Sequence, residues 1–302
     1  MPGQPDVVAT LNGFIRSDVR PEGRLPIHLT GPGDGPMPFA AAPPIAIRDA
    51  RPMLAGTTEA EHFHDHGFVL LPHTSAVADW DADAMTTPPE QNDIARLYLP
   101  EVEAMIRKRL LPGRDLNIMQ TAGLLRRGPG TPSPFYAQGV HGDHGLTADD
   151  YQESLEAFSS PEVGAMWRKG YDRPQVAGFM VINFWRPVYQ QGPLRHLPLA
   201  ICHPDSVAEG DVVPASLLDF TPTGKPTNQL SLRHNEAHRW FFYPGMTNDE
   251  VLVFKIFETF KDGRRPGLRS CFHTAFTDPA APEDAPKRQS CEHRVGVFIL
   301  ED

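Results

Sequence analysis

The chain has 302 residues, of which 40% are hydrophobic and 22% charged, a composition typical of one large globular domain or two modest ones. Its net charge of −10 argues against nucleic acid as the main partner, because phosphate binding depends on clustered Lys and Arg. No apolar stretch approaches the length needed to span a membrane.

The first third of the chain predicts few regular elements. Residues 1–60 are rich in Pro and Gly, which indicates an extended segment with short strands. Residues 67–71 predict a buried strand that ends at Pro72. We expect residues 1–115 to form an extension that packs on a core made by residues 116–302, the two forming one integrated domain.

Three helices are predicted. One starts near Pro100 and stops at Pro112-Gly113, because apolar residues recur between them at helical spacing. Thr147 has the pattern of an N-cap followed by an acidic first turn. Ser160 is a second such cap and starts a helix that ends near residue 170.

Strands dominate the second half of the chain. They are predicted over residues 176–188, 198–202, 230–243, 250–257, 269–276 and 290–300, with a hairpin loop at 262–267. The 32 prolines and 25 glycines favour short elements joined by turns. Regularly spaced strands after a helical insertion predict an all-β core with helical additions, in the form of a jelly roll.

The cysteine content indicates the compartment. Cys202, Cys271 and Cys291 are too few for a disulfide framework, and the odd count predicts free thiols. The first residues also lack the basic and apolar regions of a signal peptide. We therefore expect a cytoplasmic protein.

The segment His141-Gly142-Asp143 carries the clearest chemical signal. Side chains alternate along an extended segment, so His141 and Asp143 lie on one face. Two groups cannot fill the coordination sphere of a metal, so a third ligand must come from a distant strand. Two histidines and one carboxylate that leave three positions open form the facial triad of non-haem Fe(II) oxygenases, in which a co-substrate and dioxygen also bind the iron.

His273 is the preferred third ligand, with His238 and His203 as rivals. His238 lies on a plausible strand beside large aromatic residues, where a hydrogen-bonded core role suits it equally well. His273 follows the apolar strand 251–254 and precedes a final strand that carries arginines. That order suits an oxygenase that uses an oxoacid.

A histidine-rich run extends from Glu61 to His66. Alternation along a strand would place His62, His64 and His66 on one face. The run lacks the residue that separates the second ligand from the Asp-His pair in binuclear zinc hydrolases, and it precedes the predicted barrel. A surface or structural role is therefore favoured.

The last predicted strand places polar residues on one face by period two: Arg288, Ser290, Glu292 and Arg294. An arginine on this face is expected to bind the far carboxylate of a dicarboxylate co-substrate through a bidentate salt bridge. The alternative for Arg294 is a structural salt bridge with Glu292 or Asp302.

Five motifs follow one another along the chain: Val140-His141-Gly142-Asp143, Asn183-Phe184-Trp185-Arg186-Pro187, Pro198-Leu199-Ala200, Ala237-His238-Arg239-Trp240 and Phe272-His273-Thr274-Ala275-Phe276. Their order resembles the AsaB-type hydroxylase/desaturase family of fungal and bacterial natural-product clusters, which includes the hydroxylating component of cephamycin 7-methoxylation. The likeness extends from about residue 45 to the C-terminus. The order of the motifs is more specific than any one of them.

The resemblance implies an iron(II)/2-oxoglutarate-dependent oxygenase with a double-stranded β-helix. It maps the metal triad onto His141, Asp143 and His273. Arg288 and Ser290 look like the Arg-x-Ser clamp that holds the distal carboxylate of 2-oxoglutarate. Because the spacing of 15 residues from His273 departs from the shortest versions of this pattern, Arg294 stays an alternative anchor.

The resemblance also implies that Asn183, Trp185 and Arg186 line the pocket from a neighbouring strand. Arg186 is expected to bind a substrate or co-substrate carboxylate, and Trp185 to form an apolar wall. Plain core packing is the alternative for these residues.

The implied reaction is hydroxylation or desaturation of a small natural product, with Fe(II), 2-oxoglutarate and dioxygen as cofactors. Halogenating relatives carry a small residue in place of Asp143, so halogenation is not expected here. Two other classes stay open. One is a zinc-dependent hydrolase with a general base such as Glu292, and the other is a non-catalytic pseudo-oxygenase that binds a small molecule.

Overall fold

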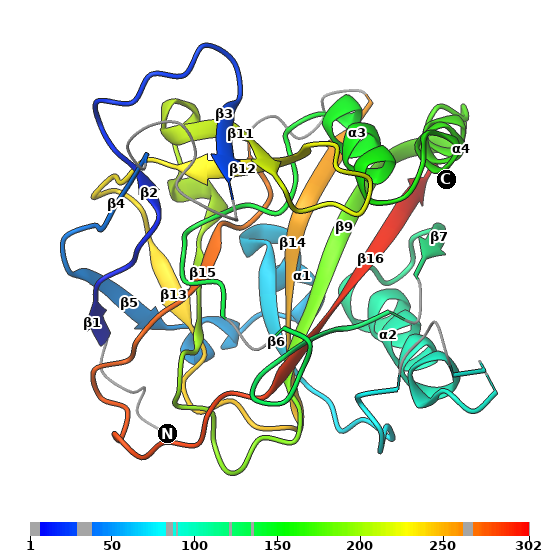
Figure 1. The fold of residues 1–302 in the computed structure, drawn as a ribbon. Helices are drawn as coiled ribbons and strands as arrows, with labels where there is room; N and C mark the ends of the chain where they lie inside the picture. Colours follow the sequence, from blue (N-terminus) through cyan, green and yellow to red (C-terminus); the bar gives the residue numbers. More distant parts are fainter. Residues whose placement is uncertain are drawn as a thin grey trace.

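The computed structural model describes residues 7–28, 38–82, 87–88, 90–120, 123–133, 136–261 and 268–301. The hairpin loop expected at 262–267, residues 29–37 of the Pro- and Gly-rich segment, and Pro134 lie outside the described residues. The described chain is mostly β, with four α-helices, and three long strands run side by side through its middle (Figure 1). The predicted β-rich fold is confirmed at this level.

The larger sheet has the order β6-β14-β9-β16-β7, and β8 also pairs with β16. Its strands are β6 (Phe68–Pro72), β7 (Leu116–Met119), β8 (Leu125–Arg127), β9 (Val176–Pro187), β14 (Glu250–Phe260) and β16 (Ser290–Leu300). The predicted strands at 67–71, 176–188, 250–257 and 290–300 are confirmed. Long runs of apolar β-formers favour central strands buried on both faces, which β9, β14 and β16 are, whereas β6 is a short strand at the edge of this sheet.

The smaller sheet packs against the larger one and has the order β1-β5-β13-β10-β15. Its strands are β1 (Val7–Ala9), β5 (Ile45–Asp49), β10 (Leu199–Cys202), β13 (Trp240–Phe242) and β15 (His273–Ala275). A third sheet combines β3 (Leu25–His28), β11 (Val212–Leu218) and β12 (Thr227–Leu232), and β2 (Phe14–Ile15) pairs with β4 (Phe39–Ala40). Strands from the first 72 residues thus enter three sheets built mainly by later parts of the chain.

The single strand predicted over 230–243 is wrong. The chain forms β12 and β13 in different sheets, joined by a turn over residues 233–239. The turn is fixed by Asp211, whose Oδ2 lies 2.9 Å from Asn235 Nδ2 and 3.1 Å from His238 Nε2. Side chains of this kind compete with strand pairing, so His238 lies in a turn and not on a strand. The strand predicted at 269–276 also shrinks, to β15.

The helices begin at capping residues. α3 (Ala148–Phe158) starts after Thr147 and α4 (Pro161–Tyr171) after Ser160, as predicted. The helix expected from Pro100 begins earlier, because π-helical turns at Ile94–Tyr98 and Ile106–Leu110 flank α2 (Leu99–Met105). No helix in the described ranges is long and apolar enough to cross a membrane.

The histidine-rich run forms α1 (Glu59–His66) and not a strand. Thr58 and Glu61 make a capping box that fixes its first turn. In a helix His62 and His66 share a face, whereas His64 points elsewhere. The strand geometry assumed for the run was therefore wrong.

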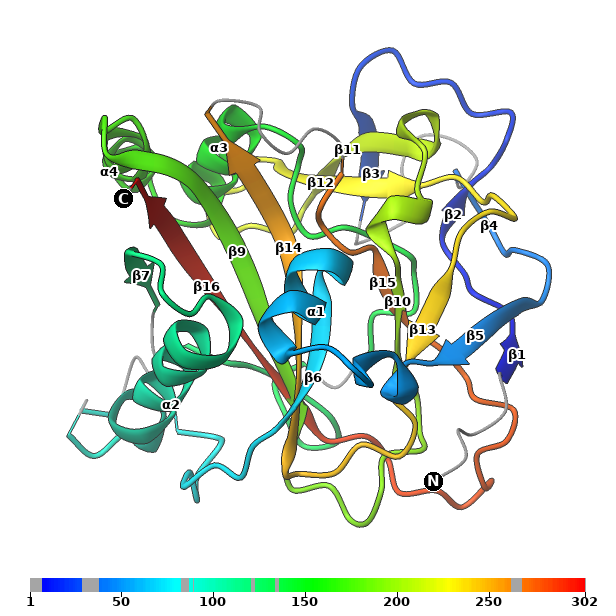
Figure 2. The same cartoon turned by 180° about the vertical axis from the view of Figure 1, so that it is seen from behind.

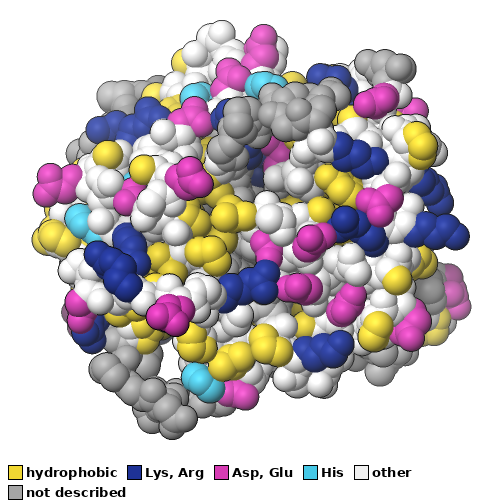
Figure 3. All heavy atoms as spheres, turned by 90° about the horizontal axis from the view of Figure 1, so that it is seen from above, with side chains coloured by type: hydrophobic (Ala, Val, Ile, Leu, Met, Phe, Trp, Pro, Cys, Tyr) yellow, Lys and Arg dark blue, Asp and Glu magenta, His cyan; other side chains and the backbone are white. Residues whose placement is uncertain are grey.

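Helices cover both faces of the larger sheet. Figure 2 shows α1 and α2 in front of the outer face, where a hydrophobic cluster that includes Phe63, Tyr98 and Ile182 lies beneath them. The inner face packs against the smaller sheet and against α3 and α4, with Trp167, Trp185 and other large side chains between them. Acidic and basic side chains are interspersed over the face seen in Figure 3.

The N-terminal segment supports the extended segment that carries His141. The carbonyl oxygen of Asn12 accepts a hydrogen bond of 2.8 Å from the backbone of Val140. Gly13 has a φ of 86°, and a Cβ there would lie 2.6 Å from the Cα of Gly139. Only glycine suits this close approach.

Three imidazoles cluster where α1 meets the end of β10. His66 Nδ1 lies 2.8 Å from His203 Nε2, and the rings of His62 and His66 are 4.4 Å apart. Burial lowers the pKa of His62 to about 4, with a smaller effect from His66. Burial, followed by Arg239, also lowers the pKa of His203 to about 4.

This cluster predicts acid sensitivity. The folded-state pKa of each buried histidine lies below its unfolded value, so stability is lost as the pH falls from about 6.5 towards 4. For His62, which is 1% exposed, we expect the free energy of unfolding to drop by roughly 1–2 kcal/mol between about pH 7 and pH 5. Urea unfolding at both pH values measures it. His62→Phe should flatten the dependence, whereas His64→Gln, an exposed site on the same helix, should leave it as steep as in the unmodified protein.

Candidate metal centre

Three side chains predicted as metal ligands meet between the two main sheets. The ligand atoms of His141, Asp143 and His273 all lie within 4.8 Å of one another. His141 Nε2 is 3.7 Å from Asp143 Oδ1, and His273 Nε2 is 3.7 Å from Asp143 Oδ2. His141 and His273, which are 132 positions apart in sequence, are joined by two backbone hydrogen bonds, because each donates to the carbonyl of the other, at 3.2 and 3.0 Å.

The two imidazoles are oriented by the backbone. His141 Nδ1 lies 2.7 Å from the carbonyl oxygen of Gly139, and His273 Nδ1 lies 3.2 Å from that of Cys271. A carbonyl accepts only, so each Nδ1 carries the proton and each Nε2 keeps a free lone pair. This is the usual outer arrangement of a histidine that binds a metal through Nε2.

Burial sets the charge of these groups. Burial, followed by the neighbouring His141, lowers the pKa of His273 to about 4, so its ring is neutral at pH 7. Burial acts to raise the pKa of Asp143, but Arg294 and the two histidines outweigh it and hold this pKa well below its usual range. Asp143 is therefore ionised, and its Oδ2 is buried without a hydrogen-bond partner in the described structure.

A small cavity of about 30 Å³ adjoins His141 and His273. It is lined by Arg127, Ala137, His141, Trp185, Leu199, His273, Arg288, Glu292 and Arg294. The alternation along β16 holds as predicted, since Glu292 and Arg294 reach the same cavity as Arg288. Arg294 Nη2 donates to Asp143 Oδ1 at 3.1 Å and lies 3.5 Å from Glu292 Oε1. The salt bridge considered for Arg294 with Glu292 is thus present, and Asp302 lies outside the described residues.

Arg288 has a different environment from Arg294. Its Nη1 donates to the carbonyl of Leu197 at 2.6 Å, and its Cζ lies 4.4 Å from the ring centroid of Tyr136. The residue is 2% exposed, its Nε has no hydrogen-bond partner, and no carboxylate pairs with it within the described ranges. Burial lowers the pKa of Arg288 to about 10. Ser290, whose Oγ is also buried without a partner, follows on the same strand face.

Three residues of β9 were expected to line the pocket, and two of them lie on the side of the sheet that faces the cavity. Trp185 lines the cavity, and Asn183 Nδ2 donates to Glu292 Oε2 at 3.2 Å. Arg186 is not brought to this site, because period two turns it to the other face of the sheet. There it bonds to the carbonyl oxygens of His73 and Asn248 and lies over Trp80, which is a structural role.

The rival histidines lie elsewhere. His238 is bound to Asp211 in the turn before β13, and His203 belongs to the cluster beside α1. In the described part of the chain, neither histidine places a ligand atom close enough to those of His141 and Asp143 to bind the same metal ion.

Two groups at the site escaped the sequence analysis. Arg127 on β8 reaches Glu292 at 3.7 Å, which follows from the β8–β16 pairing and has no local sequence signal. His144 directly follows Asp143, and this adjacency to a predicted ligand is the sequence signal that could have identified it. Its ring lies 5.1 Å from that of Tyr151, and both of its nitrogens are buried without partners in the described structure. Burial lowers the pKa of His144 to about 4.

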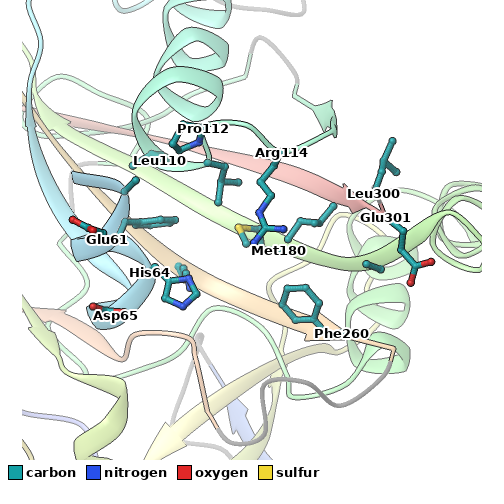
Figure 4. A pocket seen from close by; sticks show the side chains of 16 residues that line it. Glu61, His64, Asp65, Leu110, Pro112, Arg114, Met180, Phe260, Leu300 and Glu301 are labelled. Carbon is teal, nitrogen blue, oxygen red and sulfur yellow. The ribbon is translucent and has the colours of Figure 1, made fainter. Parts of the chain in front are cut away.

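A second cavity, of about 590 Å³, lies on the opposite face of the larger sheet. Figure 4 shows Glu61, His64 and Asp65 of α1 on one side of it, with Arg114 reaching over Met180. It contains none of the residues that meet near Asp143.

Known proteins place the chain in a family. Residues 39–298 match the family model described as Oxidoreductase/YMDC permease-like domain. Aspirochlorine biosynthesis protein N of Aspergillus oryzae is 34% identical over 39% of this chain and 47% of its own length. Hydroxylase/desaturase CTB9 of Cercospora beticola is 28% identical over 77% of this chain and 70% of its own length.

A solved structure shares the fold. The iron and alpha-ketoglutarate-dependent endoperoxidase NvfI matches 98% of this chain and 99% of its own with a TM-score of 0.68 at 20% identity. The chain thus shares the fold of that structure, and it spans about half the length of Aspirochlorine biosynthesis protein N. It belongs to the AsaB-type hydroxylase/desaturase family, which confirms the resemblance seen in its motifs.

Proposed function

We propose that the protein is an Fe(II)/2-oxoglutarate-dependent oxygenase that hydroxylates or desaturates a small natural product, on a double-stranded β-helix that forms one integrated domain. The observation that carries the proposal is the meeting of His141, Asp143 and His273 with their free ligand atoms turned together. Relatives with iron and 2-oxoglutarate in their names support it. The buried free cysteines support a reducing compartment such as the cytoplasm.

The donor set fits Fe(II). Two imidazoles that each bond to a carbonyl through Nδ1, and one ionised carboxylate, leave three coordination positions open, as the facial triad does. The unpartnered Oδ2 of Asp143 supports this assignment, because a buried carboxylate oxygen without a hydrogen bond is costly unless a ligand takes it up. Iron with 2-oxoglutarate would supply the oxidation of a C–H bond by dioxygen.

We assign the distal carboxylate of 2-oxoglutarate to Arg288 and Ser290. Arg288 is a buried cation with no anionic partner among the described residues, and Ser290 Oγ is an unused donor beside it. Burying such a charge alone is unfavourable, so an anionic ligand is the natural counterpart. Arg294 is already neutralised by Asp143 and Glu292, which argues against it as the anchor.

We infer that the substrate lies on the side of Asp143 where His144 and Tyr151 are found. The two unpartnered nitrogens of His144 provide hydrogen-bonding capacity there. Trp185 supplies an apolar wall to the cavity, and Asn183 keeps a free Oδ1. The other role of these residues is to exclude water, so that the reacting C–H bond is held in a dry site.

A zinc hydrolase is less well supported. Its general base would be Glu292, which accepts a hydrogen bond from Asn183 and lies between Arg127 and Arg294. These three contacts engage both oxygens of its carboxylate. The presence of all three predicted metal ligands argues against a pseudo-oxygenase. Metal analysis of protein purified without oxygen separates the readings: iron supports the oxygenase, zinc that survives chelation the hydrolase, and no metal the pseudo-oxygenase.

His273→Ala is expected to abolish Fe(II) binding, since a two-ligand site cannot hold the metal, and activity should disappear with it. Iron titration under anaerobic conditions measures this. His238→Ala is the matched control and should bind iron as the unmodified protein does, because His238 bonds to Asp211 away from the site. The opposite pattern would show that the ligand assignment is wrong.

Arg288→Gln should weaken 2-oxoglutarate binding by on the order of 2–5 kcal/mol, because it removes a charge-assisted pair and leaves a carboxylate unpaired. Calorimetric titration of the anaerobic Fe(II) protein measures the loss. Arg186→Gln serves as a control, since Arg186 lies on the other face of β9. Unchanged titrations for Arg288→Gln would exclude Arg288 as the anchor.

The reaction should couple release of succinate to products heavier by one oxygen or lighter by two hydrogens. Asp143 occupies the coordination position that a halide would need, so chloride should not be incorporated. Mass spectrometry of reactions in chloride buffer, with Asp143→Gly run in parallel, tests this. A chlorinated product from the unmodified enzyme would rule out the expected outcome, and turnover without succinate would rule out the whole class.

A further inference from the structure

Arg294 lies between two carboxylates next to the candidate metal position. A single nitrogen, Nη2, is 3.1 Å from Asp143 Oδ1 and 3.5 Å from Glu292 Oε1. Asp143 comes from the segment after β8, whereas Glu292 and Arg294 come from β16. The guanidinium therefore joins two parts of the chain at the one point where their acidic groups converge.

For Asp143, the contact divides the carboxylate into two unlike oxygens. Oδ1 accepts the hydrogen bond from Arg294, whereas Oδ2 is buried with no partner in the described structure. Carboxylates that bind metals through one oxygen commonly have the other fixed by a hydrogen bond. Arg294 occupies the oxygen that would otherwise be available for two-oxygen binding.

Glu292 is the further carboxylate nearest in placement to the site: it lines the same cavity as His141 and His273 but does not belong to their metal-sized group. Its Oε1 is buried without a hydrogen bond in the described structure and lies 3.7 and 3.5 Å from Arg127 and Arg294. Oε2 is engaged by Asn183. If Glu292 entered the coordination sphere, it would fill a position that the co-substrate and dioxygen require.

We propose that Arg294 is a positioning residue that limits Asp143 to one metal-binding oxygen and keeps Glu292 off the metal. The proposal rests on the metal site of the proposed function and assigns Arg294 a task other than anchoring 2-oxoglutarate. Arg127 assists by holding Glu292 from the other side. The pair of arginines thereby keeps the number of protein ligands at three.

Co(II) is a suitable probe, because its ligand-field absorption reports coordination number without catalysis. Arg294→Gln should give a spectrum of higher coordination number than the unmodified protein, and 2-oxoglutarate should bind the Co(II) protein at least roughly tenfold more weakly. Arg294→Lys keeps a cation and a donor and should retain the original spectrum. Adding Glu292→Gln to Arg294→Gln should return the spectrum towards the original.

An unchanged Co(II) spectrum in Arg294→Gln overturns the proposal, including the case in which only the melting temperature falls. A changed spectrum that Glu292→Gln does not reverse overturns the part that concerns Glu292. Arg288→Gln is the matched control, since Arg288 lines the same cavity without contacting Asp143, and it should keep the original spectrum before 2-oxoglutarate is added.

His273→Ala separates this proposal from the one on which it rests. Loss of Co(II) binding in His273→Ala with an unchanged Arg294→Gln spectrum refutes the role of Arg294 alone. Retention of Co(II) with the original spectrum in His273→Ala refutes the metal site itself.

Discussion

The site depends on one short antiparallel bridge. His141 and His273 each donate a backbone hydrogen bond to the other, and this pairing brings together residues 132 positions apart in sequence. Because the bridge fixes both backbones, the separation of the two imidazoles does not depend on side-chain packing alone. The carbonyls of Gly139 and Cys271, each two residues before a ligand, then set the tautomer of each ring. Strand geometry thus determines position, orientation and protonation together.

Charge near the site is distributed unevenly. Arg127 and Arg294 are balanced by Asp143 and Glu292 in one connected group, so neither of these arginines needs an anionic ligand to balance its charge. Arg288 is excluded from that balance and is surrounded by aromatic rings and a carbonyl oxygen. Buried charges without partners are unfavourable, and they are found mainly where a ligand completes them. Arg294 on β16 is therefore neutralised by the protein itself, whereas Arg288, which lies just before β16, is available to an anionic ligand.

Much of the site and several element boundaries could be predicted from the sequence, for physical reasons. A His-x-Asp pair on an extended segment fixes the relative direction of two side chains, so His141 and Asp143 needed no tertiary information. Alternation along β16 likewise predicted which face carries Arg288, Glu292 and Arg294. Capping residues predicted where α3 and α4 begin, since a cap acts within one turn.

What the sequence did not predict depends on contacts between distant residues. Side chains alternate along a strand, so Arg186 and its neighbour Trp185 lie on opposite faces of the sheet. The family resemblance nevertheless assigned both residues to the same pocket. The division of 230–243 into β12 and β13 depends on Asp211, and the partner of Glu292 on β8 depends on sheet pairing. The histidine-rich run is an exception, because the capping box made by Thr58 and Glu61 at the start of α1 is local and was present in the sequence.

The contact of Asn12 and Gly13 with the strand before His141 links the first residues of the chain to the geometry of the metal site. This support precedes residue 39, where the family match starts, so it is not part of the pattern by which the family is recognised. A shortened chain that began after Gly13 would keep all three metal ligands but would lose the backbone contacts that support the segment before His141. Tightness of metal binding would then vary with the length of the N-terminus, and relatives that differ there need another way to hold the same histidine in place.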